Sequence, residues 1–263
     1  MSETVADRLA FTIELSHRAG AAGVVHFKAL DKLEIESKGH QDLVSNADRE
    51  VETLIRDALA KAYPGDGIIG EEHGPVESTT GYTWIIDPID GTANFVRGIP
   101  AWCVVIACVD GDGALLGVTY EPSVGETFAA GRGLGATLNG KPMSVSGSQS
   151  LSDGTMGVGF SHRTEVTQII RLSEDLVSDG GIFFRNASGA LMLAYVAAGR
   201  LIGYVEPHMN PWDCVAGLLQ ITEAGGQSQP VAPDVMLKDG GPVITSCPGV
   251  FERTCELANT HFN

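Results

Sequence analysis

The apolar residues of the first 62 positions follow the spacing of two helices. Residues 4–28 carry one apolar face, formed by Val5, Leu9, Ile13 and Ala19. A polar loop, "KGHQDLVSNADRE" (residues 38–50), leads into the second helix, whose apolar face holds Val51, Leu54, Ile55 and Leu59. Ser45 and Asp48 have the spacing of a capping box with Asp in place of Glu, which predicts where this helix begins.

Short apolar runs bounded by turn residues follow, and they predict strands. The runs are "IIG" (68–70), "TWII" (83–86), "AWCVVIACVD" (101–110), "ALLGVTYEP" (114–122) and "ETFAAG" (126–131). Short turns join the last three, and Asn139-Gly140 is a strong hairpin signal. The first half is therefore predicted to be α+β, with helices beside a mainly antiparallel sheet.

The order of elements changes after about residue 150. Strands are predicted at 155–160, 181–184, 201–206 and 242–246, and helices at 163–178, 188–199, 211–225 and 248–260. This alternation is typical of a layered α/β unit. With a boundary near 140–152, the expected division is an N-terminal half, 1–145, and a C-terminal half, 146–263.

The charge of the chain limits what it binds. Its 263 residues carry a net charge of −16, so nonspecific binding to nucleic acid or to an anionic membrane is not expected. An anionic substrate would need a bound cation to attract it. Five Cys without a C-x-x-C pair, no signal-peptide pattern and no apolar run of ~20 residues predict a cytoplasmic protein that does not span a membrane.

Acidic residues stand at the ends of predicted strands and helices. Glu71 and Glu72 follow "GIIG", and Asp87 and Asp90 follow "WII". Asp213 lies in the first turn of a predicted helix, as Asp48 does. Each has an ordinary explanation by itself: a solvated turn, a helix-terminal charge or a cap. Their coincidence in one chain instead suggests oxygen ligands for Mg²⁺ or Mn²⁺.

The segment "WIIDPIDGTANFVRG" (84–98) joins these carboxylates to other useful groups. Pro88 disfavours helix, and Ile89 is expected to contribute only its carbonyl oxygen. Gly91 and Thr92 follow, with N–H groups that can receive a phosphate and a hydroxyl that can orient water. The loop is therefore interpreted as a metal-ligand set joined to a phosphate cradle.

Taken together, these residues resemble the inositol monophosphatase family of metal-dependent, lithium-sensitive phosphatases. The motifs that carry the resemblance are "GEE" (70–72), "WIIDPIDGTANF" (84–95) and "PWDCVAG" (211–217). Weaker similarities are "DLVSNAD" (42–48), "GATLNGKPMSVS" (135–146), "AYVAAGR" (194–200) and "TEAGG" (222–226). The resemblance implies a layered α-β-α-β-α sandwich and a homodimer.

The resemblance also implies a set of metal ligands. Glu71, Asp87 and the Ile89 carbonyl would hold one Mg²⁺, and Asp87, Asp90 and Asp213 a second. A third, weaker ion near Glu71 is expected, and Mn²⁺ could replace Mg²⁺.

Catalytic and substrate residues are implied in the same way. Thr92, supported by Asp48 and Glu71, would activate the attacking water, and the Gly91 and Thr92 N–H groups would bind phosphate. The expected substrate contacts are Ile89, Asp90, Gly91, Thr92, Ala187, Ser188, Gly189, Glu206 and Asp213, with Lys38 on a mobile loop over the site. Met192 and the order of Ala187-Ser188-Gly189 depart from the family pattern, which bears on the substrate.

The expected activity is hydrolysis of a small polyol phosphate by in-line attack of a metal-activated water. The first substrate is myo-inositol 1-phosphate, and the alternatives are histidinol phosphate and fructose 1,6-bisphosphate. A 3′-phosphoadenosine nucleotide is disfavoured because the chain lacks extra loops for a base. An alternative of another class is an interaction protein associated with the transcription machinery.

Overall fold

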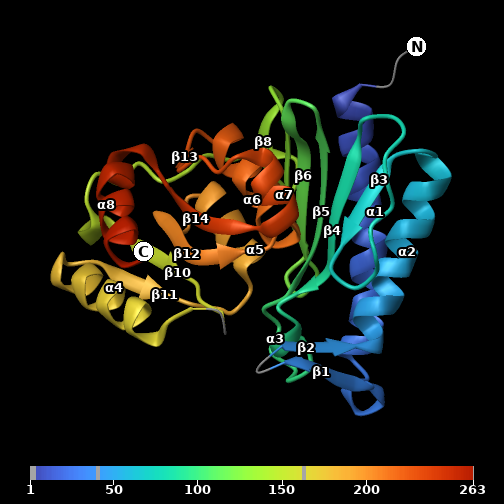
Figure 1. The fold of residues 1–263 in the computed structure, drawn as a ribbon, viewed down its shortest axis with the longest axis horizontal. Coiled ribbons are helices and arrows are strands. Elements are labelled where there is room, and N and C mark those ends of the chain that lie inside the picture. The colour runs from blue at the N-terminus through green and yellow to red at the C-terminus, as the bar shows by residue number, and fades with distance from the viewer. Residues whose placement is uncertain (1–3, 40–41, 162–163, 263) are drawn as a thin grey trace.

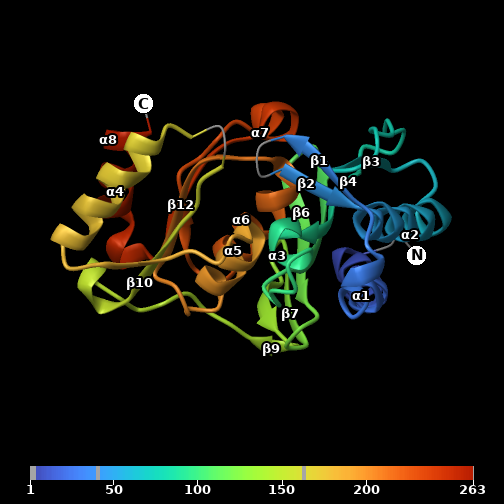
Figure 2. The same cartoon turned by 90° about the horizontal axis from the view of Figure 1, so that it is seen from below.

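The computed structural model of the chain describes residues 4–39, 42–161 and 164–262. These residues form five layers, in which helices and sheets alternate (Figures 1 and 2). Helices α1 (Val5–Phe27) and α2 (Asn46–Ala62) form one outer layer. Helices α5 (Gly189–Ala197) and α6 (Pro211–Glu223) lie between the two large sheets, and α4 (Val166–Ser178) and α8 (Phe251–His261) form the other outer layer. The predicted sandwich is confirmed.

The first large sheet has seven strands in the order β3-β4-β5-β6-β7-β8-β9. They are β3 (Gly67–Gly70), β4 (Thr83–Asp90), β5 (Cys103–Asp110), β6 (Gly113–Glu121), β7 (Glu126–Gly131), β8 (Gly135–Leu138) and β9 (Lys141–Pro142). β3 and β4 pair in parallel and all other neighbours are antiparallel. Asn139 and Gly140 both have positive φ in the two-residue turn between β8 and β9, as their hairpin signal predicts.

The second large sheet has five strands in the order β11-β10-β12-β14-β13. They are β10 (Thr155–Val158), β11 (Ile182–Phe184), β12 (Gly203–Met209), β13 (Gln227–Ser228) and β14 (Gly241–Ser246). β10 pairs in parallel with β11 and β12, whereas β14 is antiparallel to β12 and β13. The α/β alternation therefore yields a mixed sheet.

Both faces of the first sheet are buried, which explains the continuous apolar run of β4. Trp84 and Ile86 point into a core shared with α1 and α2. Ile85 points the other way, into a core shared with α5, α6 and the second sheet. The predicted division at residues 145/146 falls between β9 and β10. It stays a prediction, and the core around Ile85 contains residues from both halves.

Several segments differ from their predictions, among them α3 (Thr92–Phe95) and β13, which were not expected. The expected polar loop at 38–50 contains strand β2 (Asp42–Ser45), which pairs with β1 (Ile35–Gly39), and α2 begins within it. Leu43 and Val44 are too few to reveal a strand by periodicity, and residues 40–41 lie outside the described residues. Helix α7 (Pro233–Asp239), with Pro233 in its first turn, was not expected. None of the helices described is long and apolar enough to cross a membrane.

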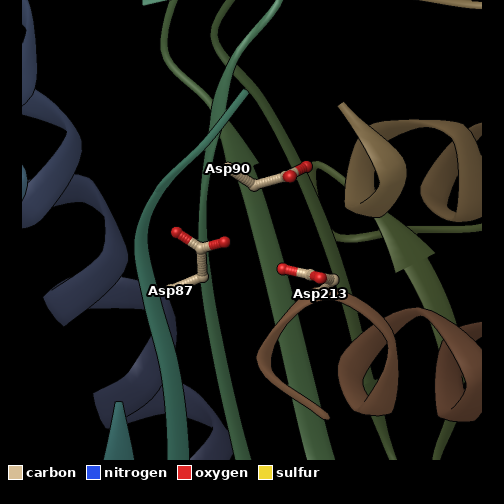
Figure 3. Close-up of side chains that lie close together, drawn as sticks. All are labelled: Asp87, Asp90 and Asp213. Carbon is tan, nitrogen blue, oxygen red and sulfur yellow. The ribbon is translucent and has the colours of Figure 1, made fainter. Parts of the chain in front are cut away.

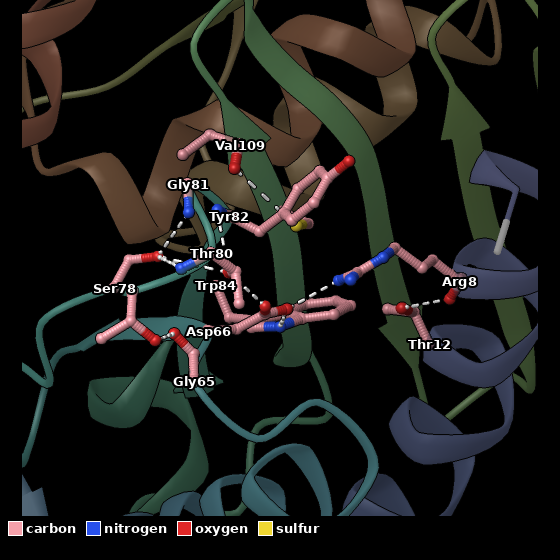
Figure 4. A network of polar contacts seen from close by, with 12 residues as sticks. Arg8, Thr12, Gly65, Asp66, Ser78, Thr80, Gly81, Tyr82, Trp84 and Val109 are labelled. Atoms are coloured by element: carbon pink, nitrogen blue, oxygen red, sulfur yellow. Dashed lines mark hydrogen bonds and ion pairs between the residues drawn. The ribbon is translucent and has the colours of Figure 1, made fainter. Parts of the chain in front are cut away.

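A buried ion pair ties α1 to the beginnings of β3 and β4 (Figure 4). Arg8 Nη1 donates to Asp66 Oδ2 at 2.7 Å, and the Arg8 guanidinium lies 4.3 Å from the ring centres of both Tyr63 and Tyr82. The Trp84 indole donates to the same Asp66 oxygen at 3.0 Å. Thr80 donates to the other oxygen at 2.6 Å, so both Asp66 oxygens have partners.

We expect Asp66→Asn to lower the free energy of unfolding by about 3 kcal/mol, because it leaves a buried Arg8 without its counter-charge. Urea denaturation of both proteins measures the change. Asp112→Asn is the control, since this side chain is 91% exposed. Equal stability of the two variants would contradict the importance given to the Arg8–Asp66 pair.

Candidate functional site

Three carboxylates from two distant parts of the chain lie close together (Figure 3). Asp87 and Asp90 come from the end of β4, and Asp213 comes from the first turn of α6. One oxygen of each lies within 4.8 Å of the others. Sequence spacing predicts the nearness of Asp87 and Asp90, whereas only the packing of α6 onto the first sheet brings Asp213 to them.

A bulge at the end of β4 explains how Asp87 and Asp90 reach one site. Residues three apart on a regular strand point to opposite faces of the sheet. Asp87 pairs with Val105 and Asp90 with Cys103, so β4 has one extra residue between the two pairs. Because of this extra residue, the two carboxylates lie on the same side of the sheet. Within the bulge, the Ile89 N–H donates to Asp87 Oδ1 at 2.9 Å.

The first turns of two helices hold the other carboxylates. Asp213 is the third residue of α6 and accepts from the Asn210 backbone N–H at 3.2 Å. Asp48 occupies the same position in α2, where Oδ2 accepts from the backbone N–H and the hydroxyl of Ser45 at 2.8 and 2.7 Å. Each capping box therefore fixes one oxygen of an acidic side chain.

Asp90 is fixed from the C-terminal half of the chain. Its Oδ2 accepts a short hydrogen bond from the Ser188 hydroxyl and another from the Ala190 N–H at 2.9 Å. The Cys103 thiol lies 3.7 Å from the same oxygen. Ser188 is completely buried, so its hydroxyl contacts Asp90 instead of lining the pocket.

Thr92 lies between Asp48 and the bulge. Its Oγ1 is 3.2 Å from Asp48 Oδ1 and 3.1 Å from the Ile89 carbonyl oxygen, and its single proton can go to either. Gly91 before it has a φ of 91°, and a Cβ there would lie 2.9 Å from the Ala101 carbonyl oxygen. This conformation and this contact explain the glycine.

Burial and mutual repulsion raise the pKa values of the clustered carboxylates. Burial and the negative charges of Glu71 and Asp90 raise the pKa of Asp87 well above its ordinary value. Burial, Asp90 and Glu206 raise the pKa of Asp213 to about 8. Among the Lys and Arg side chains that the structure describes, none forms an ion pair with these three residues, so a divalent cation fits their charge and their oxygen donors.

A pocket of about 160 Å³ opens beside the carboxylates. Asp90 and Asp213 line it together with Ala187, Gly189, Met192 and Glu206, all singled out in the sequence. Burial raises the pKa of Glu206 to about 7, while the Tyr204 hydroxyl, which donates to Glu206, and the Arg185 charge oppose that rise.

Other pocket residues have no signal in the sequence. Phe160 and Arg185 also line the pocket, and the Arg185 guanidinium lies 4.2 Å from the centre of the Phe160 ring.

Two further residues singled out in the sequence are Lys38 and Glu71. Lys38 is in strand β1, and its side chain lies outside the described part of the chain. Glu71 follows β3 and is near enough to Asp87 to influence its charge.

Comparison with known proteins identifies the group to which this chain is related. The inositol monophosphatase family matches residues 5–261. The chain belongs to this family. It is therefore a phosphatase, and the predicted family, fold and enzyme class are confirmed.

Three relatives illustrate the similarity. The chain is 38% identical to the inositol-1-monophosphatase of Rhizobium meliloti over 82% of both chains. It is 37% identical to the Nus factor SuhB of Escherichia coli over 83% of both chains. The crystal structure of the extragenic suppressor protein suhB from Bartonella henselae matches with a TM-score of 0.89 and 31% identity, over 95% of this chain and 97% of that one.

The cation-free protein is expected to lose stability relative to Asp213→Asn as the pH rises from about 5 to about 8. The pKa of Asp213 is raised from 3.8 to about 8 in the folded chain. The folded state therefore keeps a proton that the unfolded state has released, and the free energy of unfolding falls until the folded pKa is passed. Urea unfolding in EDTA at several pH values measures the trend. Asp112→Asn should follow the wild type, and a wild type that gains stability relative to Asp213→Asn would contradict the assignment.

Proposed function

We propose that the chain is a Mg²⁺-dependent phosphomonoesterase that hydrolyses a small polyol phosphate, with myo-inositol 1-phosphate as the first substrate. The observation that carries the proposal is the convergence of Asp87, Asp90 and Asp213 beside a pocket that also contains Glu206. A site of this kind combines a place for cations with a place for a hydroxyl-rich leaving group. The R. meliloti relative bears the name of this activity.

The proposed cation ligands are all oxygen atoms. Glu71, Asp87 and the Ile89 carbonyl would hold one Mg²⁺, and Asp87, Asp90 and Asp213 a second, with a weaker third ion near Glu71 and Mn²⁺ as a substitute. When bound, such ions act as Lewis acids on phosphoryl oxygens and lower the pKa of water. Asp87 would serve both positions, which agrees with the several negative charges that raise its pKa.

The geometry of the Thr92 hydroxyl supports a role in orienting water. Its proton is directed to Asp48 or to the Ile89 carbonyl, so its lone pairs can accept a hydrogen bond from water. Asp48 is completely buried and fixed by its capping box, and it can receive the proton that Thr92 passes on. We propose that Thr92, Asp48 and Glu71 orient and deprotonate the attacking water, while the Gly91 and Thr92 N–H groups hold the phosphate.

Glu206 is the proposed contact for a substrate hydroxyl. Glu206 lines the pocket, and its Oε2 accepts a hydrogen bond from the Tyr204 hydroxyl. Ala187 and Gly189 supply little side-chain volume, which leaves space for a ring, and Met192 adds an apolar contact. For Ser188, contact with Asp90 replaces the direct substrate contact expected from the sequence.

The remaining expectations accompany this proposal. They are inhibition by Li⁺, a homodimer, a cytoplasmic location, and no direct binding of nucleic acid or membrane. Lys38 over the site also stays a prediction.

Phosphate release tests the activity directly. We expect Mg²⁺-dependent, Li⁺-inhibited release from myo-inositol 1-phosphate, compared with histidinol phosphate and fructose 1,6-bisphosphate. Asp90→Asn should reduce turnover by at least ~100-fold because it removes a ligand charge. Asp112→Asn makes the same chemical change in an exposed turn and should be as active as the wild type. Equal rates for Asp90→Asn and the wild type at millimolar Mg²⁺ would contradict the proposal.

One observation favours the bisphosphate as an alternative substrate. Arg185 is exposed, lines the pocket and stacks on Phe160, so its cation can meet a second phosphate.

If Arg185 has this role, Arg185→Met should lower kcat/KM for fructose 1,6-bisphosphate about 10-fold, a loss of about 1.4 kcal/mol, and leave myo-inositol 1-phosphate nearly unchanged. Arg171→Met removes the same charge from the exposed surface of α4 and is the matched control. Steady-state kinetics on both substrates decides. Equal losses on the two would show that Arg185 shapes the pocket without selecting the substrate.

The alternative of another class is a partner of the transcription machinery. The name Nus factor SuhB of the E. coli relative is the observation that favours it. A folded protein that releases no phosphate from any compound of the panel would favour this binding role over the enzymatic one.

A further inference from the structure

A second buried acidic side chain lies on α2, one turn after Asp48. Glu52 is completely buried, and Arg56, four residues later, donates from Nε to Glu52 Oε1 at 2.7 Å. The Arg56 side chain is 14% exposed, so the pair is almost entirely removed from water. Such a pair contributes little net stability by itself, which makes its other contacts informative.

Those contacts are with the turn that follows β3. Glu52 Oε2 accepts from the Glu72 N–H at 2.8 Å, and Oε1 accepts from the His73 N–H at 3.1 Å. Arg56 Nη2 donates to the His73 carbonyl oxygen at 2.9 Å. The pair therefore satisfies three backbone groups of the turn, and these bonds fix its path whatever side chains it carries.

The contact is close enough to determine a residue of the sequence. A Cβ on Gly70 would collide with the Glu52 carboxylate and approach Arg56 Nη2 to 3.0 Å. Gly70 immediately precedes Glu71. The glycine of "GEE" is thus explained by the approach of Glu52 to the backbone.

One face of α2 therefore contacts both Thr92 and the turn that carries Glu71. Asp48 and Glu52 are four residues apart, which places them on the same side of the helix, and both are fully buried. Asp48 contacts Thr92, and Glu52 contacts the turn of Glu71. The helix can set the separation between Thr92 and Glu71, while Arg56 neutralises Glu52 beside an already acidic cluster.

We propose that Glu52, neutralised by Arg56, is a positioning residue that holds Glu71 where a divalent cation requires it. The inference rests on the proposed function, in which Glu71 is a cation ligand. Glu52 would not touch the cation or the substrate. Its effect would pass through the backbone of the turn, as supporting hydrogen bonds around metal ligands do in general.

Mn²⁺ binding tests the inference without turnover. Electron paramagnetic resonance titration counts bound Mn²⁺ for the wild type, Glu52→Gln and Asp66→Asn. We expect Glu52→Gln to lower the affinity for one of the bound Mn²⁺ ions by about 10-fold to 100-fold. Asp66→Asn breaks another buried ion pair, beside the opposite end of β3, and should bind Mn²⁺ like the wild type. Arg56→Lys keeps the charge but cannot hold Glu52 and His73 together, and it serves as the second variant if Glu52→Gln does not fold.

A double-mutant cycle shows whether Glu52 acts through Glu71. If it does, Glu52→Gln should add no more than about 2-fold to the loss of affinity in Glu71→Gln. If the losses of Mn²⁺ affinity in the two single variants multiply in the double variant, the inference is overturned. A second outcome would also overturn it: Glu52→Gln binds Mn²⁺ as tightly as Asp66→Asn does, while Glu71→Gln binds it more weakly than the wild type. In that second case the proposed function would stand. Unchanged Mn²⁺ binding by Glu71→Gln would instead remove Glu71 from the proposed ligands, and the inference with it.

Discussion

The mutual repulsion of buried carboxylates is the constraint on which the rest of the site depends. Asp87, Asp90 and Asp213 converge within 4.8 Å. Burial raises the pKa of all three, and neighbouring negative charges add to the rise for Asp87 and Asp213. Left to itself, such a group would move apart or retain protons. The three carboxylates are held in place by features that carry no charge: a strand bulge, a helix cap and the Ser188 hydroxyl.

The layered fold supplies the third carboxylate by close packing between its halves. Helix α6 lies so near the first sheet that a Cβ on Gly117 of β6 would come within 2.6 Å of the Ala216 backbone. On its other side, a Cβ on Gly217 would meet the Leu193 side chain of α5. Gly117 on β6, with Ala216 and Gly217 one turn after Asp213, therefore lets α6 approach, and the approach completes the acidic cluster. The packing of α6 between the two sheets therefore also assembles the site.

Local signals in the sequence predicted much of this arrangement, because capping and turn chemistry act over a few residues. Ser45 with Asp48 marked the start of α2, and Asn139-Gly140 marked a hairpin. The bulge between Asp87 and Asp90 was beyond such reasoning, since it depends on the pairing with β5. Ser188 and Arg185 show the same limit: one contacts a residue 98 positions away, and the other enters the pocket only through the fold.

The two buried ion pairs stand near opposite ends of β3. Asp66, paired with Arg8, directly precedes β3 and binds the indole of Trp84 at the start of β4. Glu52, paired with Arg56, holds the turn after β3, and β4 ends at Asp87 and Asp90. The parallel pair of strands is thus fixed at its beginning and at its end. Binding of a cation by the folded state alone would add stability where repulsion is greatest, in proportion to the logarithm of its concentration over Kd. The fold can therefore tolerate an acidic cluster because two ion pairs fix the strands on either side of it, and a bound cation would offset the repulsion.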